Sequence, residues 1–281
     1  MSEVFLNGAF MAREKASVSV LDRGFLLGDG IYEVIPAYHG CLFRLEEHMR
    51  RLSDSLAAVG IHNPHSNDEW SNLLNTLVQK NGAGDLSVYL QVTRGVAERD
   101  HAFPQDVSPT VFAMATPIPA PDLSAMDKGV AAMVLEDDRW KHCDIKSISL
   151  QANVLLRQKA IEHGFAEAVL VRNGLVTEGA ASNLFIVKQG TVITPPKSPY
   201  LLPGITRDLV VELLNTHGIS CIERDIPLKE MYSSDEVWLS SSTKEVMAVI
   251  RLDKHIVGNG LPGPVWKQLI EYYREYKRSL K

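Results

Sequence analysis

Hydrophobic and polar positions alternate with two different periods along the chain, and each period predicts one kind of element. Apolar residues recur at three- and four-residue spacing between Arg44 and Val59, which predicts an amphipathic helix ending at Gly60. The same spacing and clear stop signals predict further helices over residues 68–79, 150–163, 203–217 and 265–280. Runs of β-forming residues predict strands over residues 30–34, 86–93, 111–115, 183–187 and 236–239.

Short polar pairs between apolar runs predict the tight turns. Asn7-Gly8 predicts a hairpin within residues 3–20, and Asn173-Gly174 predicts another between residues 168–171 and 175–177. Gln189-Gly190 predicts a turn into residues 191–194. The proline-rich stretch that follows Thr116 cannot continue a sheet ladder. We therefore expect a linker over residues 117–121, between domains over residues 1–116 and 122–281.

Composition places the chain among ordinary globular proteins. The 281 residues are 45% hydrophobic and 22% charged, enough for one large domain or two smaller ones. The net charge of −5 argues against a general nucleic-acid or membrane-surface role. No apolar run reaches the roughly 20 residues of a membrane span, and the first residues lack a signal-peptide pattern. Three widely spaced cysteines predict neither a disulfide framework nor a metal site. We expect a cytoplasmic protein without a metal.

One lysine and one carboxylate are the strongest candidates for chemistry. Lys146 lies among apolar residues with Arg139 upstream, and burial or a cationic neighbour favours a neutral amine that can condense with an aldehyde. Glu178 follows the second predicted hairpin, so it should lie at a strand end. Taken alone, each residue fits an ordinary role, as a surface charge or as part of a turn. The glycine-rich segment 22–30 has neither dinucleotide nor P-loop spacing.

Four separated motifs together resemble the fold-type IV pyridoxal-phosphate-dependent transaminases, a family that includes D-amino-acid and branched-chain transaminases and aminodeoxychorismate lyase. The motifs are DRGFLLGDGIYEV (residues 22–34), CDIKS (143–147), NGLVTEGAASNLF (173–185) and LLPGITRD (201–208). They occur in the family's order over nearly the whole chain. The resemblance implies an α/β fold of two domains in an α+β arrangement, with a small N-terminal and a larger C-terminal domain. It also implies a coenzyme in the cleft between them and a homodimer.

The resemblance further assigns residues to pyridoxal 5′-phosphate. Lys146 would form the Schiff base and move the substrate proton, Glu178 would keep the pyridine nitrogen protonated, and Leu202 would pack on the ring. Phosphate contacts are implied for Arg51, Ile205, Thr206, Ser241 and Ser242. A helix start offers N–H groups and a positive dipole end, and arginine suits phosphate. A helix cap for Thr206 and an ordinary loop for the serines remain alternatives. The resemblance also places Arg139 near Lys146, where its charge would disfavour the protonated amine.

Arg99 and His101 separate the branches of the family. In an extended loop two such residues point the same way and make a carboxylate receptor. Composition alone favours a polar surface loop. The Arg-x-His-x-Phe-Pro pattern resembles the D-amino-acid transaminase branch, in which this loop reaches across the dimer and Tyr32 faces the active site. Tyr32, Arg99 and His101 would then bind the substrate carboxylate.

The expected activity is transamination between D-amino acids, such as D-alanine, and 2-oxo acids, such as 2-oxoglutarate or pyruvate. A branched-chain L-amino-acid transaminase and aminodeoxychorismate lyase share the expected coenzyme site and remain alternatives. The family also includes (R)-amine transaminases, although the Arg99–His101 pair argues for a substrate with a carboxylate. From another class, the chain could be a catalytically silent binding protein that kept the fold.

Overall fold

The computed structural model describes residues 2–82, 84–119 and 128–280, and these residues form two compact units. The first unit comprises residues 2–119, 145–149 and 280, and the second comprises residues 128–144 and 150–279. The chain therefore enters the second unit, returns to the first for five residues around Lys146, and then leaves again. Two residues of the predicted linker, Ala120 and Pro121, lie outside the described residues, so the predicted domain boundaries stay a prediction.

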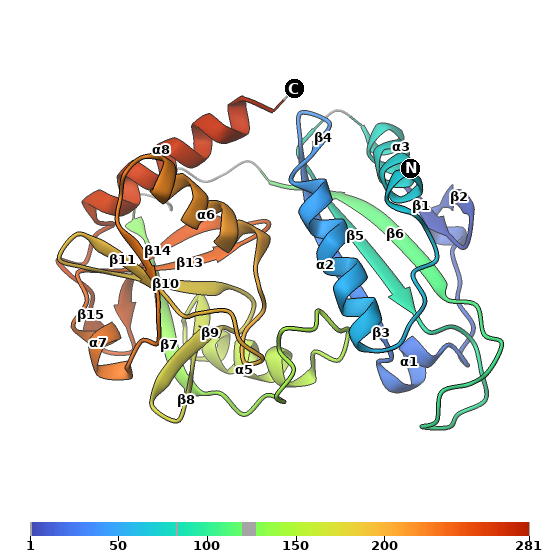
Figure 1. The fold of residues 1–281 in the computed structure, drawn as a ribbon, viewed down its shortest axis with the longest axis horizontal. Coiled ribbons are helices and arrows are strands. Elements are labelled where there is room, and N and C mark those ends of the chain that lie inside the picture. Colours follow the sequence, from blue (N-terminus) through green and yellow to red (C-terminus); the bar gives the residue numbers. More distant parts are fainter. Residues whose placement is uncertain (1, 83, 120–127, 281) are drawn as a thin grey trace. The chain divides into compact units, whose positions relative to one another are not determined.

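An antiparallel sheet with six described strands forms the centre of the first unit, in the order β2-β1-β6-β5-β3-β4 (Figure 1). Its strands are β1 (Glu3–Leu6), β2 (Ala9–Ala12), β3 (Gly30–Tyr38), β4 (Cys41–Leu42), β5 (Leu86–Thr93) and β6 (Thr110–Pro117). The unit also contains the short helices η1 (Arg13–Lys15) and α1 (Arg23–Leu27) and the longer helices α2 (Leu45–Ala58) and α3 (Asn67–Asn81). Helix α2 packs on β3, and α3 packs on β1 and β6. Their apolar faces and the sheet enclose a core that includes Leu52, Trp70 and Leu74, all fully buried.

The predicted local elements of this unit are largely confirmed. Strands β1 and β2 pair through a turn in which Asn7 and Gly8 both have positive φ, as an Asn-Gly hairpin requires. The hairpin is shorter than predicted, because β2 ends at Ala12 and residues 13–15 form a 3₁₀ turn. Helix α3 begins at a capping box in which Ser66 and Glu69 bond reciprocally. Helix α1 was not predicted, and Asp22 caps it by accepting the Gly24 N–H.

The second unit is built on a mixed sheet, with nine strands among its described residues (Figure 1). Eight follow the order β12-β11-β10-β13-β14-β7-β8-β9, and β15 pairs with β14. The strands are β7 (Val130–Glu136), β8 (Glu167–Arg172), β9 (Leu175–Gly179), β10 (Asn183–Lys188), β11 (Thr191–Thr194), β12 (Cys221–Glu223), β13 (Glu236–Ser241), β14 (Glu245–Leu252) and β15 (His255–Ile256). The helices are α5 (Gln151–Glu162), α6 (Ile205–Thr216), α7 (Leu228–Tyr232) and α8 (Pro264–Arg278).

Two tight hairpins predicted for this unit are confirmed. The turn between β8 and β9 has positive φ at Asn173 and Gly174, and the turn between β10 and β11 has it at Gln189 and Gly190. Helix α8 starts against Glu236 of β13, whose carboxylate accepts the N–H groups of Val265 and Trp266. Throughout the described ranges, no helix is both long and apolar enough to cross a membrane.

Candidate active site

Lys146 is held against β3 by backbone pairing. The Tyr32 N–H donates to the Lys146 carbonyl at 3.0 Å, and the Ile148 N–H donates to the Gly30 carbonyl at 3.0 Å. Residues 31 and 147 form an antiparallel bridge between these bonds. On the other side, the Lys146 N–H donates to the Ser55 hydroxyl of α2 at 3.3 Å. The lysine backbone is therefore fixed between a strand and a helix of the first unit.

The side chain of Lys146 lies over an aromatic residue of β3. Its Nζ is 4.4 Å from the centre of the Tyr32 ring. The Tyr32 ring in turn stacks on Tyr89 of β5, with ring centres 5.8 Å apart. Burial raises the pKa of Tyr89 to about 12, so this phenol stays neutral and donates to Gln91 Oε1 at 2.6 Å. The structure thus brings two predicted site residues, Lys146 and Tyr32, into contact.

A buried charged cluster lies on the next residue of β3. Glu33 is fully buried, and it accepts hydrogen bonds from Arg51 Nε at 2.8 Å and Arg51 Nη2 at 2.7 Å. His48 Nδ1 lies 2.7 Å from Glu33 Oε2. Both partners come from α2, where they are three residues apart and share one face. The predicted phosphate contact of Arg51 stays a prediction, whereas its fork-like pairing with Glu33 is a feature of the structure.

The charges of this cluster follow from its burial. Burial raises the pKa of Glu33, but the Arg51 guanidinium and His48 outweigh it, so the net pKa lies well below the usual range. Burial lowers the pKa of His48, and the neighbouring Glu33 only partly offsets this. Glu33 is therefore ionised at neutral pH and His48 is neutral, with Nδ1–H as donor. A charged Arg51 held in this way has a fixed orientation.

The second unit buries Glu178 at the end of β9. Glu178 Oε1 accepts from Arg139 Nη1 at 2.6 Å, and Oε2 accepts from the Leu202 N–H at 3.0 Å and from Asn183 Nδ2 at 3.2 Å. Arg139 is oriented by Asp137, which accepts from Arg139 Nε at 2.9 Å and Nη2 at 3.0 Å. The Leu202 carbonyl also accepts from Asn183 at 2.8 Å. Predicted residues Glu178 and Leu202 are thus neighbours, connected through Asn183.

Burial and the arginine act in opposite directions on Glu178. Burial raises the pKa of Glu178 to about 7, although the Arg139 charge and hydrogen bond lower it. Burial likewise raises the pKa of Asp137, but Arg139 outweighs it, so the net pKa is lowered. The structure gives Arg139 two carboxylate partners, and its predicted effect on the protonation of Lys146 stays a prediction. A buried carboxyl group with a raised pKa is suited to accept a hydrogen bond from a protonated ring nitrogen.

Helix α6 begins close to Asn183 and is suited to bind an anion. The N-cap of α6 is Gly204, which has no side chain to cap the helix, and Ile205, Thr206 and Arg207 in the first turn are buried. The N–H groups of a first helical turn have no partner within the helix, and the positive dipole end favours negative charge. The approach to Asn183 requires glycine, since a Cβ on Gly204 would lie 2.0 Å from the Asn183 Oδ1.

Hydroxyl groups without partners lie beside this helix start. Asn183 is paired in register with Ser240 of β13, so the end of β13 that carries Ser241 and leads to Ser242 lies next to it. The Ser182 and Ser240 hydroxyls are buried and find no hydrogen-bond partner among the described residues. Burying a hydroxyl without a partner is unfavourable unless a ligand supplies one. Orphaned donors beside a helix N-terminus and a buried carboxylate together fit a phosphate-bearing pyridine coenzyme.

Arg99 and His101 lie on the loop between β5 and β6, and both are exposed. Their side chains make no hydrogen bond or ion pair with any residue that the structure describes. The role predicted for Arg99 and His101 in binding the substrate carboxylate therefore stays a prediction. Two exposed donors on one loop remain able to meet a carboxylate.

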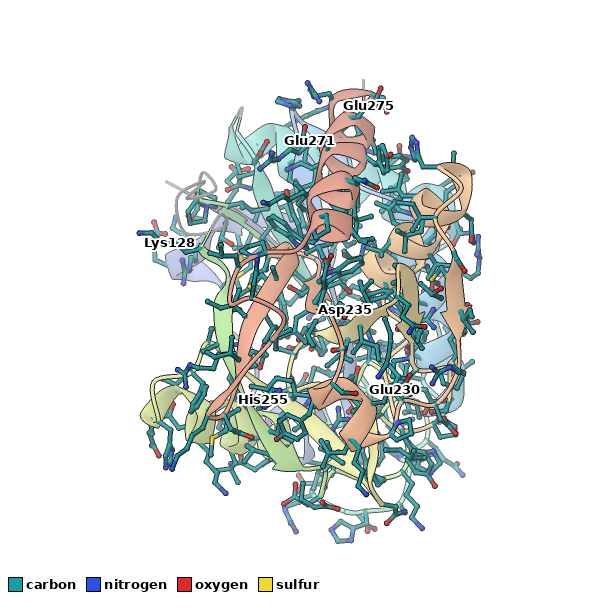
Figure 2. The ribbon with its side chains drawn as sticks, turned by 90° about the vertical axis from the view of Figure 1, so that its left-hand side faces the viewer. Lys128, Glu230, Asp235, His255, Glu271 and Glu275 are labelled. Atoms are coloured by element: carbon teal, nitrogen blue, oxygen red, sulfur yellow. The ribbon has the colours of Figure 1, made fainter. Side chains whose placement is uncertain are left out.

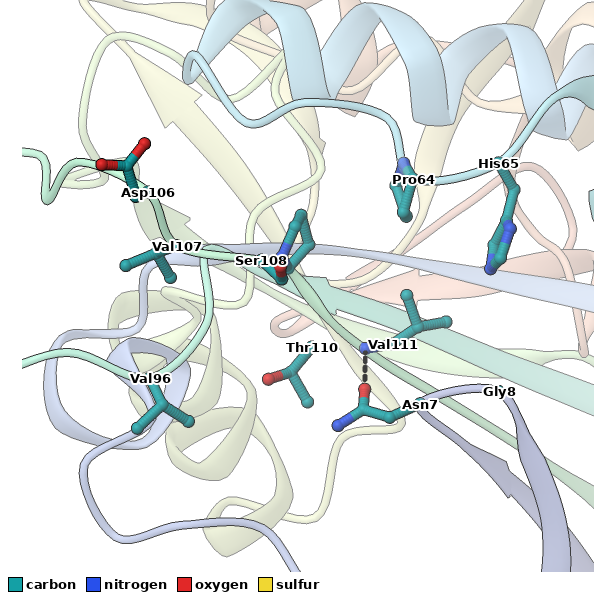
Figure 3. A pocket seen from close by; sticks show the side chains of 11 residues that line it. Asn7, Gly8, Pro64, His65, Val96, Asp106, Val107, Ser108, Thr110 and Val111 are labelled. Atoms are coloured by element: carbon teal, nitrogen blue, oxygen red, sulfur yellow. Dashed lines mark hydrogen bonds between the residues drawn. The ribbon is translucent and has the colours of Figure 1, made fainter.

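The pocket in Figure 3 is separate from these residues. It lies in the first unit, has a volume of about 540 Å³ and is lined by 11 residues that include His65, Asp106 and Val111. The Val111 N–H donates to the Asn7 side chain at its edge. No predicted site residue lines it. Among the described residues, no group of three or more His, Cys, Asp or Glu side chains could hold a metal ion.

Sequence reasoning missed four polar residues that the structure places around the predicted ones: Glu33, His48, Asp137 and Asn183. Two signals were present in the sequence. Glu33 is a charged residue within an otherwise apolar strand, where burial without a partner would be unfavourable. His48 and Arg51 have helical i, i+3 spacing on the face that carries the apolar residues. For Asp137 and Asn183 no local pattern in the sequence indicates the hydrogen bonds that they make around Glu178 and Arg139.

Comparison with known proteins adds an independent line of evidence. Residues 30–252 match the family described as amino-transferase class IV. The chain is 42% identical over 267 residues to the D-alanine aminotransferase of Bacillus licheniformis, covering 95% of this chain and 94% of that protein. It is 38% identical to the D-alanine aminotransferase of Staphylococcus haemolyticus, with 99% of each chain covered. The solved branched-chain amino acid aminotransferase of T.th. with pyridoxamine 5′-phosphate has a TM-score of 0.92 at 26% identity, covering 100% of this chain and 95% of that one.

Proposed function

The chain belongs to the class IV aminotransferase family, and we propose that it transfers amino groups between D-amino acids, such as D-alanine, and 2-oxo acids, such as 2-oxoglutarate or pyruvate. The observation that carries the substrate class is the full-length similarity to D-alanine aminotransferases. The solved relative that contains pyridoxamine 5′-phosphate supports pyridoxal 5′-phosphate as the coenzyme. The buried carboxyl group of Glu178 and the orphaned hydroxyls beside α6 support it independently.

Each predicted residue has a task in holding this coenzyme. Lys146 would carry it through Nζ, and Glu178 would accept a hydrogen bond from its ring nitrogen. Leu202 would pack on the ring. Phosphate would be held by the start of α6, with Ile205 and Thr206, by Ser241 and Ser242 at the end of β13, and by Arg51. When bound, pyridoxal phosphate accepts the amino group and withdraws electron density from the substrate α-carbon.

The proton transfer falls to Lys146. Its Nζ would take the proton from the substrate α-carbon as general base and deliver it as general acid to the coenzyme's C4′, and the second half-reaction would run these transfers in reverse. The contact with the Tyr32 ring limits where Nζ can move. Tyr32, Arg99 and His101 would bind the substrate carboxylate and so decide which face of the α-carbon meets Nζ. Placing the carboxylate elsewhere would present the hydrogen of the other enantiomer.

A homodimer is part of the same proposal. Exposed apolar side chains gather in two segments of the first unit: Val18, Val20, Leu21 and Phe25 in one, and Val96 and Phe103 in the other. The two segments are joined by the hydrogen bonds Arg23 N–H to Gly95 O and Ala97 N–H to Leu21 O. Contiguous exposed apolar surface of this kind supports association. Arg99 and His101 lie on the second segment, where a partner's site could use them.

A cytoplasmic location also belongs to the proposal. Cys41, Cys143 and Cys221 are all free. Unpaired cysteines are usual in proteins of reducing compartments, where thiols are kept reduced. The three free thiols therefore support the proposed location.

The main alternative is a branched-chain L-amino-acid transaminase, since the solved structural relative has that activity in its name. A paired assay separates the two: the purified protein with pyridoxal phosphate is given 2-oxoglutarate with either D-alanine or L-leucine. We expect turnover with D-alanine and little with L-leucine, and the reverse would establish the alternative. Release of pyruvate from aminodeoxychorismate without an amino acceptor would indicate the lyase.

A variant of Lys146 tests the mechanism itself. Lys146→Ala should lower kcat with D-alanine at least about 100-fold, because the general base is lost. The exposed Lys141, five residues upstream, is the matched control, and Lys141→Ala should keep the wild-type rate. Near-normal turnover in Lys146→Ala would remove this lysine from the mechanism.

A further inference from the structure

A buried arginine forms hydrogen bonds with the backbone of the loop that carries Arg99 and His101. Arg23, the first residue of α1, is 3% exposed. Its Nη1 donates to the carbonyl of Asp100 at 2.6 Å and to the carbonyl of Ala102 at 3.2 Å. These two carbonyls flank His101 on either side, and Asp100 directly follows Arg99. The backbone that presents both exposed side chains is therefore fastened at two points to one guanidinium.

A second arginine, the first residue of the same loop, contacts a residue further along it. The guanidinium of Arg94 lies 3.7 Å from the centre of the Phe103 ring. Its Nη1 and Nη2 also donate to the carbonyls of Gly60 and Val59, each at 2.8 Å, just beyond the end of α2. Arg94 thus connects the loop to the helix that carries Ser55 and Arg51.

One carboxylate couples the two arginines. Asp29 Oδ2 accepts from Arg23 Nε at 2.8 Å and from Arg94 Nε at 2.7 Å, and Asp29 Oδ1 accepts from Arg94 Nη2 at 3.0 Å. Asp29 is the residue before β3, three positions from Tyr32. Asp29 is the ionic partner of both arginines among the described residues, so it couples the two guanidinium groups that hold the loop.

The loop itself gives a reason for this arrangement. It spans residues 94–109 between β5 and β6 and has no helix or strand of its own. Loops of this length are mobile unless side chains fasten them, and a receptor that is misplaced by about 1 Å loses much of its effect. Burying charged side chains is unfavourable unless their pairing is complete. Here the buried Arg23 guanidinium completes its pairing with two carbonyls of the loop, so its burial holds the loop in place.

The geometry points to Arg23, Asp29 and Arg94 as positioning residues that hold the loop carrying the Arg99–His101 receptor at a fixed place on the first unit. The inference rests on the proposed role of that receptor in binding the substrate carboxylate. The three residues do not touch the substrate. They act by fixing the loop, so their loss should weaken carboxylate binding more than it slows chemistry.

The test uses the holoenzyme and the substitution Arg23→Lys. Lysine keeps the charge, but one ammonium cannot replace a guanidinium fork that reaches Asp29 and two carbonyls. The KM for D-alanine and the Ki of propionate, an unreactive carboxylate, should both rise at least about tenfold. The kcat should change by less than about threefold, since an interaction that acts on binding alone leaves it unchanged. Arg50→Lys, at an exposed arginine of α2, is the matched control and should leave KM and Ki at wild-type values.

A second variant removes no side chain from the core of the chain. Phe103 is 63% exposed in one chain, so Phe103→Ala should leave its fold intact, but it removes the ring on which Arg94 stacks. Because Phe103 also belongs to the proposed dimer surface, sedimentation of the variant at the wild-type mass is required as a control. The Ki of propionate should rise about threefold, as expected for the loss of a cation–π contact. An unchanged Ki in both Arg23→Lys and Phe103→Ala would overturn the inference.

Combined variants separate positioning from general structural support. In a background of Arg99→Ala with His101→Ala, Arg23→Lys should cause no further rise in the Ki of propionate, because the receptor it positions is already gone. If Arg23→Lys adds its full effect in that background, or lowers coenzyme affinity and kcat as much as carboxylate binding, Arg23 is a structural residue and the inference is wrong. If Arg99→Ala with His101→Ala leaves KM and Ki unchanged, the receptor assignment itself fails, and this inference fails with it.

Discussion

Replacing Glu178 with glutamine tests whether burial or the neighbouring arginine decides the charge of this carboxyl group. Glu178 is 4% exposed, and both of its oxygens accept hydrogen bonds, from Arg139 on one side and from Leu202 and Asn183 on the other. Glutamine keeps the size of the side chain but does not titrate. Any pH-dependent difference in stability between the two proteins therefore reports proton binding at Glu178.

The sign and size of the difference follow from the pKa. Burial raises the pKa of Glu178 from 4.5 to about 7, against the opposing effect of Arg139. The folded protein then binds the proton more tightly than the unfolded chain. This contribution is fully present below the unfolded value and is lost as the pH rises through the folded value. Each tenfold change in proton affinity corresponds to about 1.4 kcal/mol, so the whole difference is about 3 kcal/mol.

The assay is urea unfolding of the coenzyme-free protein at several pH values between the two pKa values and above them. The unfolding free energy of wild type minus that of Glu178→Gln should fall by about 3 kcal/mol over this range. Glu275→Gln, at an exposed residue of α8 in the same unit, is the control for the substitution itself (Figure 2). A flat difference for Glu178→Gln would mean that Arg139 keeps Glu178 ionised, which would refute the argument from burial.

Two further predictions test the assembly and one helix end. Sedimentation of the purified protein should give about twice the chain mass of 31.1 kDa, because the apolar segments around Phe25 and Phe103 would be covered, and a mass of 31.1 kDa would contradict the proposed dimer. Glu236→Ala should lower the unfolding free energy by about 3 kcal/mol. It leaves three donors without their acceptor: the backbone N–H groups of Val265 and Trp266 in α8 and the indole N–H of Trp238. Glu275→Ala, on the exposed side of α8, should change it by less than about 0.5 kcal/mol.

The parts of the fold that could be predicted are those decided by neighbouring residues. The Asn7-Gly8 and Asn173-Gly174 turns form as predicted because only a few residue types accept positive φ at both positions. Helix α2 forms because its apolar residues share one face that packs on β3. The strand order of the second sheet, in contrast, could not be predicted from neighbouring residues. Its β7 pairs in parallel with both β8 and β14, and no local pattern determines which strands become neighbours.

The candidate site shows the same division. Resemblance to a family located Lys146 and Glu178, whereas their supporting residues emerge only from packing. Glu33 is visible in the sequence as a charge within an apolar strand, but its partners lie 15 and 18 residues away on α2. The Arg23–Asp29–Arg94 network is harder still to predict, because it joins segments more than 60 residues apart, and one of its acceptors is a backbone carbonyl, a group that any residue possesses.

The placement of Lys146 explains why sequence order misleads about its surroundings. It lies between segments of the second unit, yet its backbone bonds to Tyr32 of β3 and to Ser55 of α2, about 115 and 90 residues earlier in the sequence. The position of its amine is therefore decided by the first unit. The same strand carries Tyr32 and Glu33, and the residue just before it is Asp29, which couples the two arginines that hold the Arg99–His101 loop. Strand β3 is thus the common support of the lysine, the buried charge cluster and the proposed carboxylate receptor, so a disturbance of this strand should affect all three together.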